Sequence, residues 1–154
     1  MLTTKWLLEE AAQAKPKEYT SDEIVHWQML KEVSELAAAI DSYSFPPPDS
    51  LSSKQPTSKS RLIGKLVRFI ELALWAAQFD EYDMRYEWDD VWKNYAFWGR
   101  RPRDRKKVTF PLWGYFSASN PAESLLQIVC LCHVLGITQE EIENAIVSSW
   151  EWKV

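Results

Sequence analysis

Two glutamates in the segment "KEVSEL" (residues 31–36) have the spacing of a metal site. Glu32 and Glu35 are three positions apart, so their side chains leave a helix on the same side. Magnesium prefers oxygen ligands in octahedral geometry, and the bound ion can polarise a phosphoryl oxygen and activate a water molecule. Glu32 and Glu35 are therefore candidate catalytic and metal-binding residues. The alternative is that they are two solvated charges on a surface helix.

Basic and aromatic side chains gather in a second region, the connector at residues 99–118. Cations for phosphates and rings for bases are the ingredients of a surface that binds nucleotides or single-stranded nucleic acid. The same composition is typical of a solvated connector beside an aromatic core. Because the net charge is -4 and no recognised nucleic-acid module accompanies the connector, we do not expect nucleic acid as the partner. The basic residues are Arg100, Arg101, Arg103, Arg105, Lys106 and Lys107.

Helical periodicity and capping residues predict the architecture that must position these side chains. Glycine is rare, with 4 residues in 154, and no segment alternates strictly between polar and apolar residues as a strand would. We expect one all-α domain, residues 1–154, built as a bundle of five or six helices. The predicted helices span about residues 4–14, 20–41, 61–80, 81–98, 120–136 and 138–154.

The predicted helix ends depend on particular capping residues. Thr20 with Glu23 and Thr138 with Glu141 have the spacing of capping boxes, and Asn120 can cap a helix that has Pro121 at its first position. Gly99 and Gly136 are suited to end helices in the left-handed conformation. Residues 44–60, rich in Pro and Ser, form a long loop that we expect to be flexible, either a functional lid or an insertion.

The buried faces of two helices are also predicted. Helix 61–80 has a broad apolar arc typical of the centre of a bundle, and Arg68 and Glu71, in its polar stripe, are expected to form a surface ion pair. The apolar face of helix 20–41 should be buried, with His26 near its middle as a hydrogen-bonded, mostly buried histidine. That face contains Met29, Leu30, Val33, Leu36, Ala37 and Ile40.

Cys130 and Cys132, followed by His133, are the only cysteines. Side chains two apart on a helix point to different sides, and a metal site would need further Cys or His ligands, so we expect buried free thiols. No apolar run reaches the length of a membrane span, and the N-terminus has acids where a signal peptide would be apolar. We therefore expect no membrane insertion and a cytoplasmic location.

The segment "KEVSELAAAI" resembles the first motif helix of the all-α nucleotide pyrophosphatases, the superfamily of MazG and the dimeric dUTPases. Members usually read Glu-Glu-x-x-Glu-Leu there, and this chain has Lys31 first, then Glu32, Glu35 and Leu36. The segment "NPAESLLQIVCLCHVLGITQEEIENAI" is similar to the second motif region in length, apolar rhythm and its "LGITQEE" ending. The segment "YAFWGRR" resembles the aromatic and basic segment that follows the first motif in dimeric dUTPases.

The second motif of the family, Glu-x-x-Asp, is altered in this register. Asn120 stands in place of the glutamate and Glu123 in place of the aspartate. A rival register places the motif intact at Glu87 and Asp90 in "YEWDDVW", which lacks the downstream Leu-Gly-Ile. Both registers remain open. The substitutions are also compatible with a bundle that has lost catalysis and kept a binding role.

The resemblance implies a magnesium-dependent enzyme that cleaves a nucleoside triphosphate to a monophosphate and pyrophosphate. Glu32, Glu35 and Glu123 would hold the metal, with Glu87 and Asp90 as the alternative second pair. The ligand would be a nucleotide or another small phosphorylated molecule, and family members pair helices between protomers, so a homodimer is expected. The implied substrate-binding residues are Trp98 for a base, Arg100 and Arg101 for phosphate, and Asn120.

A non-enzymatic helical adaptor or inhibitor is the competing prediction. Nine tryptophans, a basic connector and a Pro/Ser loop suit a protein that presents aromatic anchors to a partner. An enzyme of the predicted kind takes two acids from each of two helices. It therefore needs at least four carboxylates that converge on one polar cleft. An adaptor needs an exposed aromatic patch instead.

Overall fold

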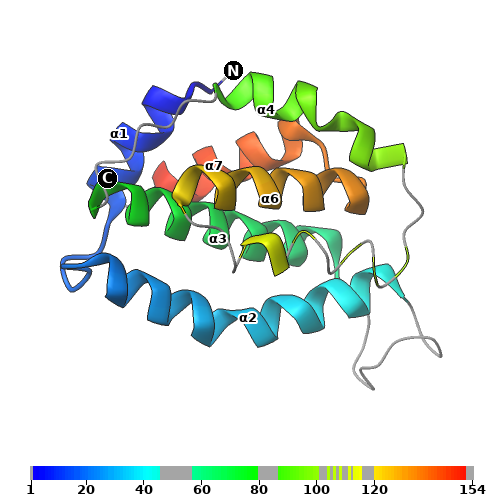
Figure 1. Cartoon of the computed structure of the whole chain (residues 1–154), viewed down its shortest axis with the longest axis horizontal. Helices are drawn as coiled ribbons and strands as arrows, with labels where there is room; N and C mark the ends of the chain where they lie inside the picture. Colours follow the sequence, from blue (N-terminus) through cyan, green and yellow to red (C-terminus); the bar gives the residue numbers. More distant parts are fainter. Residues whose placement is uncertain are drawn as a thin grey trace.

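The computed structural model describes residues 2–45, 57–79, 87–100, 104, 106, 108, 111, 113–115 and 120–151. These residues are mostly helical and include no strand, which confirms the all-α prediction (Figure 1). None of the described helices is both long and apolar enough to cross a membrane. The helices are α1 (Thr4–Ala14), α2 (Asp22–Ser44), α3 (Lys59–Phe79), α4 (Trp88–Asn94), the 3-10 helix η1 (Ala96–Arg100), α6 (Pro121–Leu135) and α7 (Gln139–Glu151).

Helix α3 is the centre of the bundle, as its broad apolar arc predicts. It contacts α1, α2, α6 and α7, and it runs between them in Figure 1. From Leu66 to Ala77 every residue is buried except Arg68, which is half-buried. The buried stretch includes Glu71, a charged residue in the middle of an apolar core. Helix α2 packs chiefly against α3 and lies at the edge of the bundle (Figure 1).

Several predicted caps form. The Asn120 side chain accepts a hydrogen bond from the Glu123 N–H at 2.9 Å and so caps α6, where Pro121 is the first residue. Gly136 ends α6 in the left-handed conformation at φ 74°. Thr138 and Glu141 form the predicted capping box, in which the Thr138 N–H donates to Glu141 Oε1 at 3.1 Å and the Glu141 N–H donates to Thr138 Oγ1 at 3.2 Å.

Other predicted boundaries are wrong. The N-cap of α2 is Ser21, so the box between Thr20 and Glu23 does not start this helix. Gly99 does not end a helix in the left-handed conformation, because η1 continues through it to Arg100. A Cβ at Gly99 would lie 3.4 Å from the His133 carbonyl oxygen, an ordinary van der Waals contact, so the approach of η1 to α6 does not require glycine.

The Pro/Ser-rich loop is shorter than predicted. Helix α2 continues to Ser44 and α3 begins at Lys59. The Thr57 N–H donates to Ser42 Oγ at 2.8 Å, which holds the start of α3 beside the end of α2. Residues 46–56, on which the prediction of flexibility depends, lie outside the described residues, as does most of the connector at 99–118.

Candidate functional site

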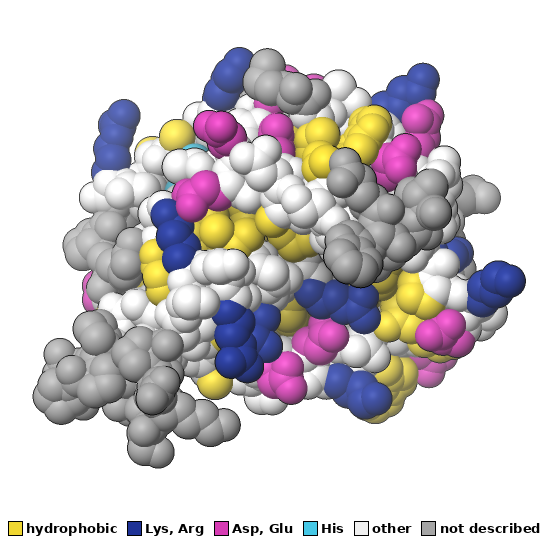
Figure 2. All heavy atoms as spheres, turned by 180° about the vertical axis from the view of Figure 1, so that it is seen from behind, with side chains coloured by type: hydrophobic (Ala, Val, Ile, Leu, Met, Phe, Trp, Pro, Cys, Tyr) yellow, Lys and Arg dark blue, Asp and Glu magenta, His cyan; other side chains and the backbone are white. Residues whose placement is uncertain are grey.

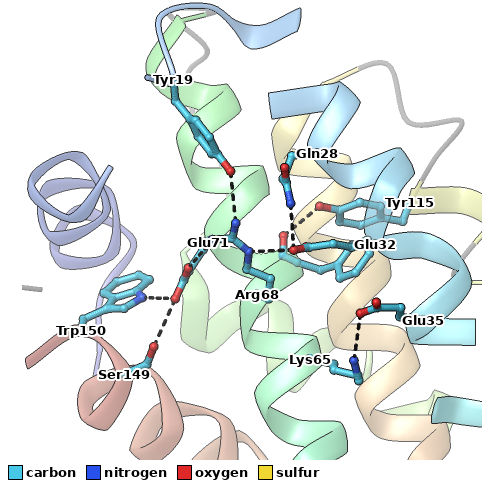
Figure 3. Close-up of polar contacts among 11 residues, drawn as sticks. Tyr19, Gln28, Glu32, Glu35, Lys65, Arg68, Glu71, Tyr115, Ser149 and Trp150 are labelled. Atoms are coloured by element: carbon cyan, nitrogen blue, oxygen red, sulfur yellow. Dashed lines mark hydrogen bonds and ion pairs between the residues drawn. The ribbon is translucent and has the colours of Figure 1, made fainter. Parts of the chain in front are cut away.

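Glu32 and Glu35 lie on the side of α2 that faces α3 (Figure 3). Arg68 Nε donates to Glu32 Oε1 at 3.2 Å, and Lys65 Nζ lies 3.3 Å from Glu35 Oε2. As the residue number rises from 32 to 35 on α2, the partner's number falls from 68 to 65 on α3, because the two helices are antiparallel. Each candidate carboxylate is therefore already paired with a cation.

Arg68 is the centre of a larger polar network. Besides Glu32, its guanidinium donates to Glu71 Oε2 at 3.3 Å and to the Tyr19 hydroxyl at 3.2 Å. The Gln28 amide also donates to Glu32 Oε1, at 3.1 Å. The network therefore joins α2, α3 and the segment between α1 and α2.

The network continues from Glu71 into α7. Glu71 is only 2% exposed, and its Oε1 accepts hydrogen bonds from Trp150 Nε1 at 2.7 Å and Ser149 Oγ at 3.3 Å (Figure 3). A buried carboxylate is stable only when it is paired and hydrogen-bonded. Glu71 and Arg68 do form the predicted ion pair, but it lies inside the bundle instead of on its surface. We name the set Tyr19, Gln28, Glu32, Arg68, Glu71, Ser149 and Trp150 the Arg68 network.

Burial and the nearby charges shift the pKa values of Arg68 and Tyr115. Burial opposes the positive charge of Arg68, yet the Glu32 carboxylate, with Tyr19 and Glu71, raises its pKa above the ordinary value. Burial raises the pKa of Tyr115 well above the ordinary value, and the nearby negative charge of Glu32 raises this pKa further. Tyr115 therefore remains a neutral donor, and its hydroxyl donates to the Phe69 carbonyl at 2.8 Å.

A cavity of about 230 Å³ lies between α2 and α3 beside these ion pairs. Glu32 Oε2, the carboxylate oxygen that does not accept from Arg68, is buried and has no hydrogen-bond partner among the described residues. Arg61 is exposed and forms no ion pair with any residue that the structure describes. The cavity is lined by Glu32, Glu35, Leu36, Arg61, Gly64, Lys65, Arg68 and Phe69, and we name it the α2–α3 cavity.

The predicted magnesium ligands are not brought together. Within the described ranges, no group of three His, Cys, Asp or Glu side chains is arranged to hold a metal ion. Glu123 is exposed in the first turn of α6 and does not line the α2–α3 cavity. With Glu32 and Glu35 each paired to a cation, the carboxylates that the structure describes do not fit a magnesium site.

In the alternative acidic pair, Glu87 joins the starts of two helices. Glu87 Oε1 accepts a hydrogen bond from the Thr4 N–H at 3.0 Å, and Thr4 Oγ1 accepts one from the Trp88 N–H at 2.9 Å. These bonds hold the first turn of α1 against the first turn of α4. Asp90 is exposed on α4, and neither acid lines the α2–α3 cavity. The geometry thus gives Glu87 a structural role.

The predicted substrate-binding residues lie elsewhere. Trp98 is half-buried in η1 and packs on the core beside Phe97, with ring centroids 6.1 Å apart. Arg100 is exposed at the end of η1, and Arg101 lies outside the described residues. Asn120 is engaged as the cap of α6. None of the described three lines the α2–α3 cavity.

The cysteines are buried and free, as predicted. Burial raises the pKa of the Cys132 thiol, so it is not a reactive thiolate. His133 Nε2 lies 2.9 Å from the Trp92 carbonyl oxygen, which links α6 to α4. His26, by contrast, is exposed on α2, so its predicted burial is wrong.

No protein-family model, curated protein or solved structure matches the chain. The resemblance to the all-α nucleotide pyrophosphatases is therefore supported by the motif residues alone. Membership of that superfamily stays a prediction.

Proposed function

We propose that this protein is a non-enzymatic interaction protein that binds through the outward face of α2. The observation that supports this most directly is the exposure of Trp27 and Leu30, which are 62% and 54% exposed. The sequence predicts Leu30 and Ala37 on a buried face, but both are exposed, so the prediction is wrong for these two residues. Met29, Leu36 and Ile40 of the same predicted face are buried. We name Ile24, Trp27, Leu30, Ser34, Ala37 and Ala38 the α2 outer face.

Trp27 is the expected anchor of this surface. Four other tryptophans, at 75, 88, 92 and 150, are buried and belong to the core. Burying the exposed part of one tryptophan side chain contributes about 3 kcal/mol at about 25 cal/mol per Å². Tryptophan is also among the residues that most often dominate the binding energy of an interface.

A second copy of the chain is the partner that the α2 outer face fits. The large residues Trp27 and Leu30 lie in the first half of α2, and the small residues Ala37 and Ala38 lie in the second half. Antiparallel pairing of two copies would place Trp27 of one chain opposite Ala37 and Ala38 of the other. Lys31 and Glu35 lie on one flank of this face and have opposite charges. The same antiparallel pairing would therefore bring Lys31 of one copy close to Glu35 of the other.

The mixed charge of the surface supports a protein partner over nucleic acid. Lys and Arg side chains are interspersed with Asp and Glu on the face of the molecule shown in Figure 2. Apolar side chains lie between these charges, and the described side chains of that face form no broad region of one sign. Nucleic-acid binding depends on cations that follow a phosphate backbone.

A cysteine placed in the α2 outer face should report the second copy. We expect Ser34→Cys to give a covalent dimer with a short thiol-specific crosslinker, because antiparallel pairing brings this part of α2 close to its counterpart. Cys130 and Cys132 are buried and should not react. Ser148→Cys, on the exposed surface of α7, is the matched control and should remain monomeric on a denaturing gel. Equal crosslinking of the two variants would contradict the proposal.

Magnesium-dependent nucleotide hydrolysis is the second candidate. One observation favours it: Glu32 and Glu35 line a single cavity together with Arg61, Lys65 and Arg68, cations that suit phosphate. Against it, this chain's described acids do not fit the metal. The two candidates give opposite results in a screen of nucleoside triphosphates with magnesium. Pyrophosphate release that Glu35→Gln abolishes would establish the enzyme and exclude the non-enzymatic assignment.

A further inference from the structure

We infer that the α2–α3 cavity binds a small aliphatic carboxylate, with the carboxylate group at Arg61 and Lys65 and the apolar chain over Gly64. All three residues line this cavity. None of the lining residues belongs to the α2 outer face, so the inference does not depend on the proposed function. It concerns a small molecule, whereas the proposed function concerns a protein partner.

Gly64 leaves one wall of the cavity open. It lies inside α3 and has no positive φ, so the backbone does not require glycine there. The antiparallel register of the two ion pairs between α2 and α3 places Leu36 level with Gly64. A Cβ at Gly64 would meet nothing within 4 Å. Glycine inside a helix is unfavourable relative to alanine, and one reason to have it is the close approach of a ligand to the backbone.

Arg61 is the cation that can hold the charged end of the ligand. Its side chain is exposed and forms no ion pair with any residue that the structure describes. The other two cations of the lining are engaged, Lys65 with Glu35 and Arg68 with Glu32. A guanidinium binds a carboxylate through two parallel hydrogen bonds, so Arg61 suits this group.

Lys65 supplies a second donor on the same side of α3. It follows Arg61 by four residues, about 6 Å along the helix axis at about 1.5 Å per residue. An ammonium group has three N–H donors, and the printed partner of Lys65 Nζ is Glu35 Oε2 at 3.3 Å (Figure 3). Because the Glu35 side chain is 68% exposed, this ion pair is weak, and a bound carboxylate can share Lys65 with it.

The acids of the lining favour a ligand with a single negative charge. Glu32 and Glu35 line the same cavity as Arg61 and Lys65. A second negative charge on the ligand would be repelled by these carboxylates. A phosphate ester has nearly two negative charges at neutral pH, so a carboxylate suits the cavity better.

The cavity also has an apolar side and a limited size. Leu36 and Phe69, which line it, are each 1% exposed, whereas Arg61 and Gly64 are exposed at its open side. A ligand with a charged end and an apolar chain matches this division. The volume of about 230 Å³ is smaller than a site for a drug-sized molecule, so the chain should be short.

An NMR titration of the nitrogen-labelled protein with hexanoate tests the assignment. The chain has 4 glycines, so their amides form a small set of signals. We expect a saturable shift of the Gly64 amide and no shift of the Gly136 amide, which does not line the cavity. Hexylamine, of opposite charge, should not bind. Acetate, which lacks the chain, should bind at least about tenfold more weakly than hexanoate.

Arg61→Ala should raise the dissociation constant of hexanoate at least about tenfold. Arg100→Ala, which removes an exposed arginine at the end of η1, is the matched control and should bind like the wild type. Gly64→Leu, followed through the signals of hexanoate itself, should abolish binding because the leucine side chain would fill the cavity. Unchanged circular dichroism would confirm that the three variants are folded.

Four results would overturn the inference. They are the absence of a saturable shift at Gly64, equal binding of hexylamine and hexanoate, wild-type affinity in Arg61→Ala, and displacement of hexanoate by an equal concentration of inorganic phosphate. The last result would show that the cavity prefers a phosphate group to a carboxylate.

Discussion

Replacing Glu71 with alanine should lower the free energy of unfolding by about 3–5 kcal/mol, as removing one partner of a buried ion pair does. The substitution leaves Trp150 Nε1 without its acceptor at 2.7 Å and removes one carboxylate from Arg68. Both groups are in the core or beside it, where water replaces a lost partner poorly. Urea denaturation followed by tryptophan fluorescence measures the change.

Glu35→Ala is the matched control for this prediction. Glu35 is also paired with a cation at 3.3 Å, but its side chain is 68% exposed. Exposed ion pairs contribute about 0–1 kcal/mol, so the control should unfold at nearly the wild-type urea concentration. If the two variants lost similar stability, the Arg68 network would not be the buried network that its contacts indicate.

Trp75→Ala should lower the free energy of unfolding by about 3–5 kcal/mol, the range for truncating a buried large aromatic side chain. Trp75 is fully buried in α3, and its Nε1 donates to the Ala11 carbonyl at 2.9 Å, which ties α1 to the centre of the bundle. Its ring packs edge-on against Tyr19 at 5.3 Å, and the Arg68 guanidinium lies 5.1 Å from the ring centroid. The substitution therefore leaves a cavity and an orphaned carbonyl.

Differential scanning calorimetry of Trp75→Ala and Trp75→Phe separates these contributions. The Phe variant retains most of the ring volume and loses the indole donor, so it should fall between the wild type and Trp75→Ala. Trp27→Ala, which removes an exposed tryptophan from the same bundle, should change the free energy of unfolding of the monomer by less than about 0.5 kcal/mol. A large loss in Trp27→Ala would mean that this side chain belongs to the core.

Much of the fold follows from local signals in the sequence. The bounds of α1 and the caps of α6 and α7 depend on residues within one turn of each helix end, so periodicity and capping rules predict them. The centre of the bundle, α3, is recognisable from its broad apolar arc. The buried free cysteines follow from their spacing in an apolar helix.

The candidate site is less predictable because it depends on contacts between distant segments. Glu71 lies in a polar stripe of α3, and the sequence alone does not show that Trp150 of α7 covers it. The pairing of Glu32 with Arg68 requires the antiparallel register of α2 and α3, which no local rule supplies. The spacing of Arg68 and Glu71 predicts their ion pair, but it does not predict that the pair is buried.

The apolar face of α2 illustrates a second limit. This helix has apolar residues around most of its circumference, so periodicity places the buried face only approximately. Leu30 is predicted inside but is exposed, while Val25 and Ala39 are buried. Helix α2 has more apolar residues than α3 can cover. This excess supports a partner on the α2 outer face.

Sedimentation equilibrium of the wild type and Trp27→Asp tests the central claim most directly. We expect a wild-type dimer, and a dissociation constant raised at least about 100-fold by a charge at the anchor position. Trp113→Asp, at a tryptophan that is 74% exposed outside the α2 outer face, is the control and should remain dimeric. A wild-type monomer, or a dimer that Trp27→Asp leaves intact, would contradict the account.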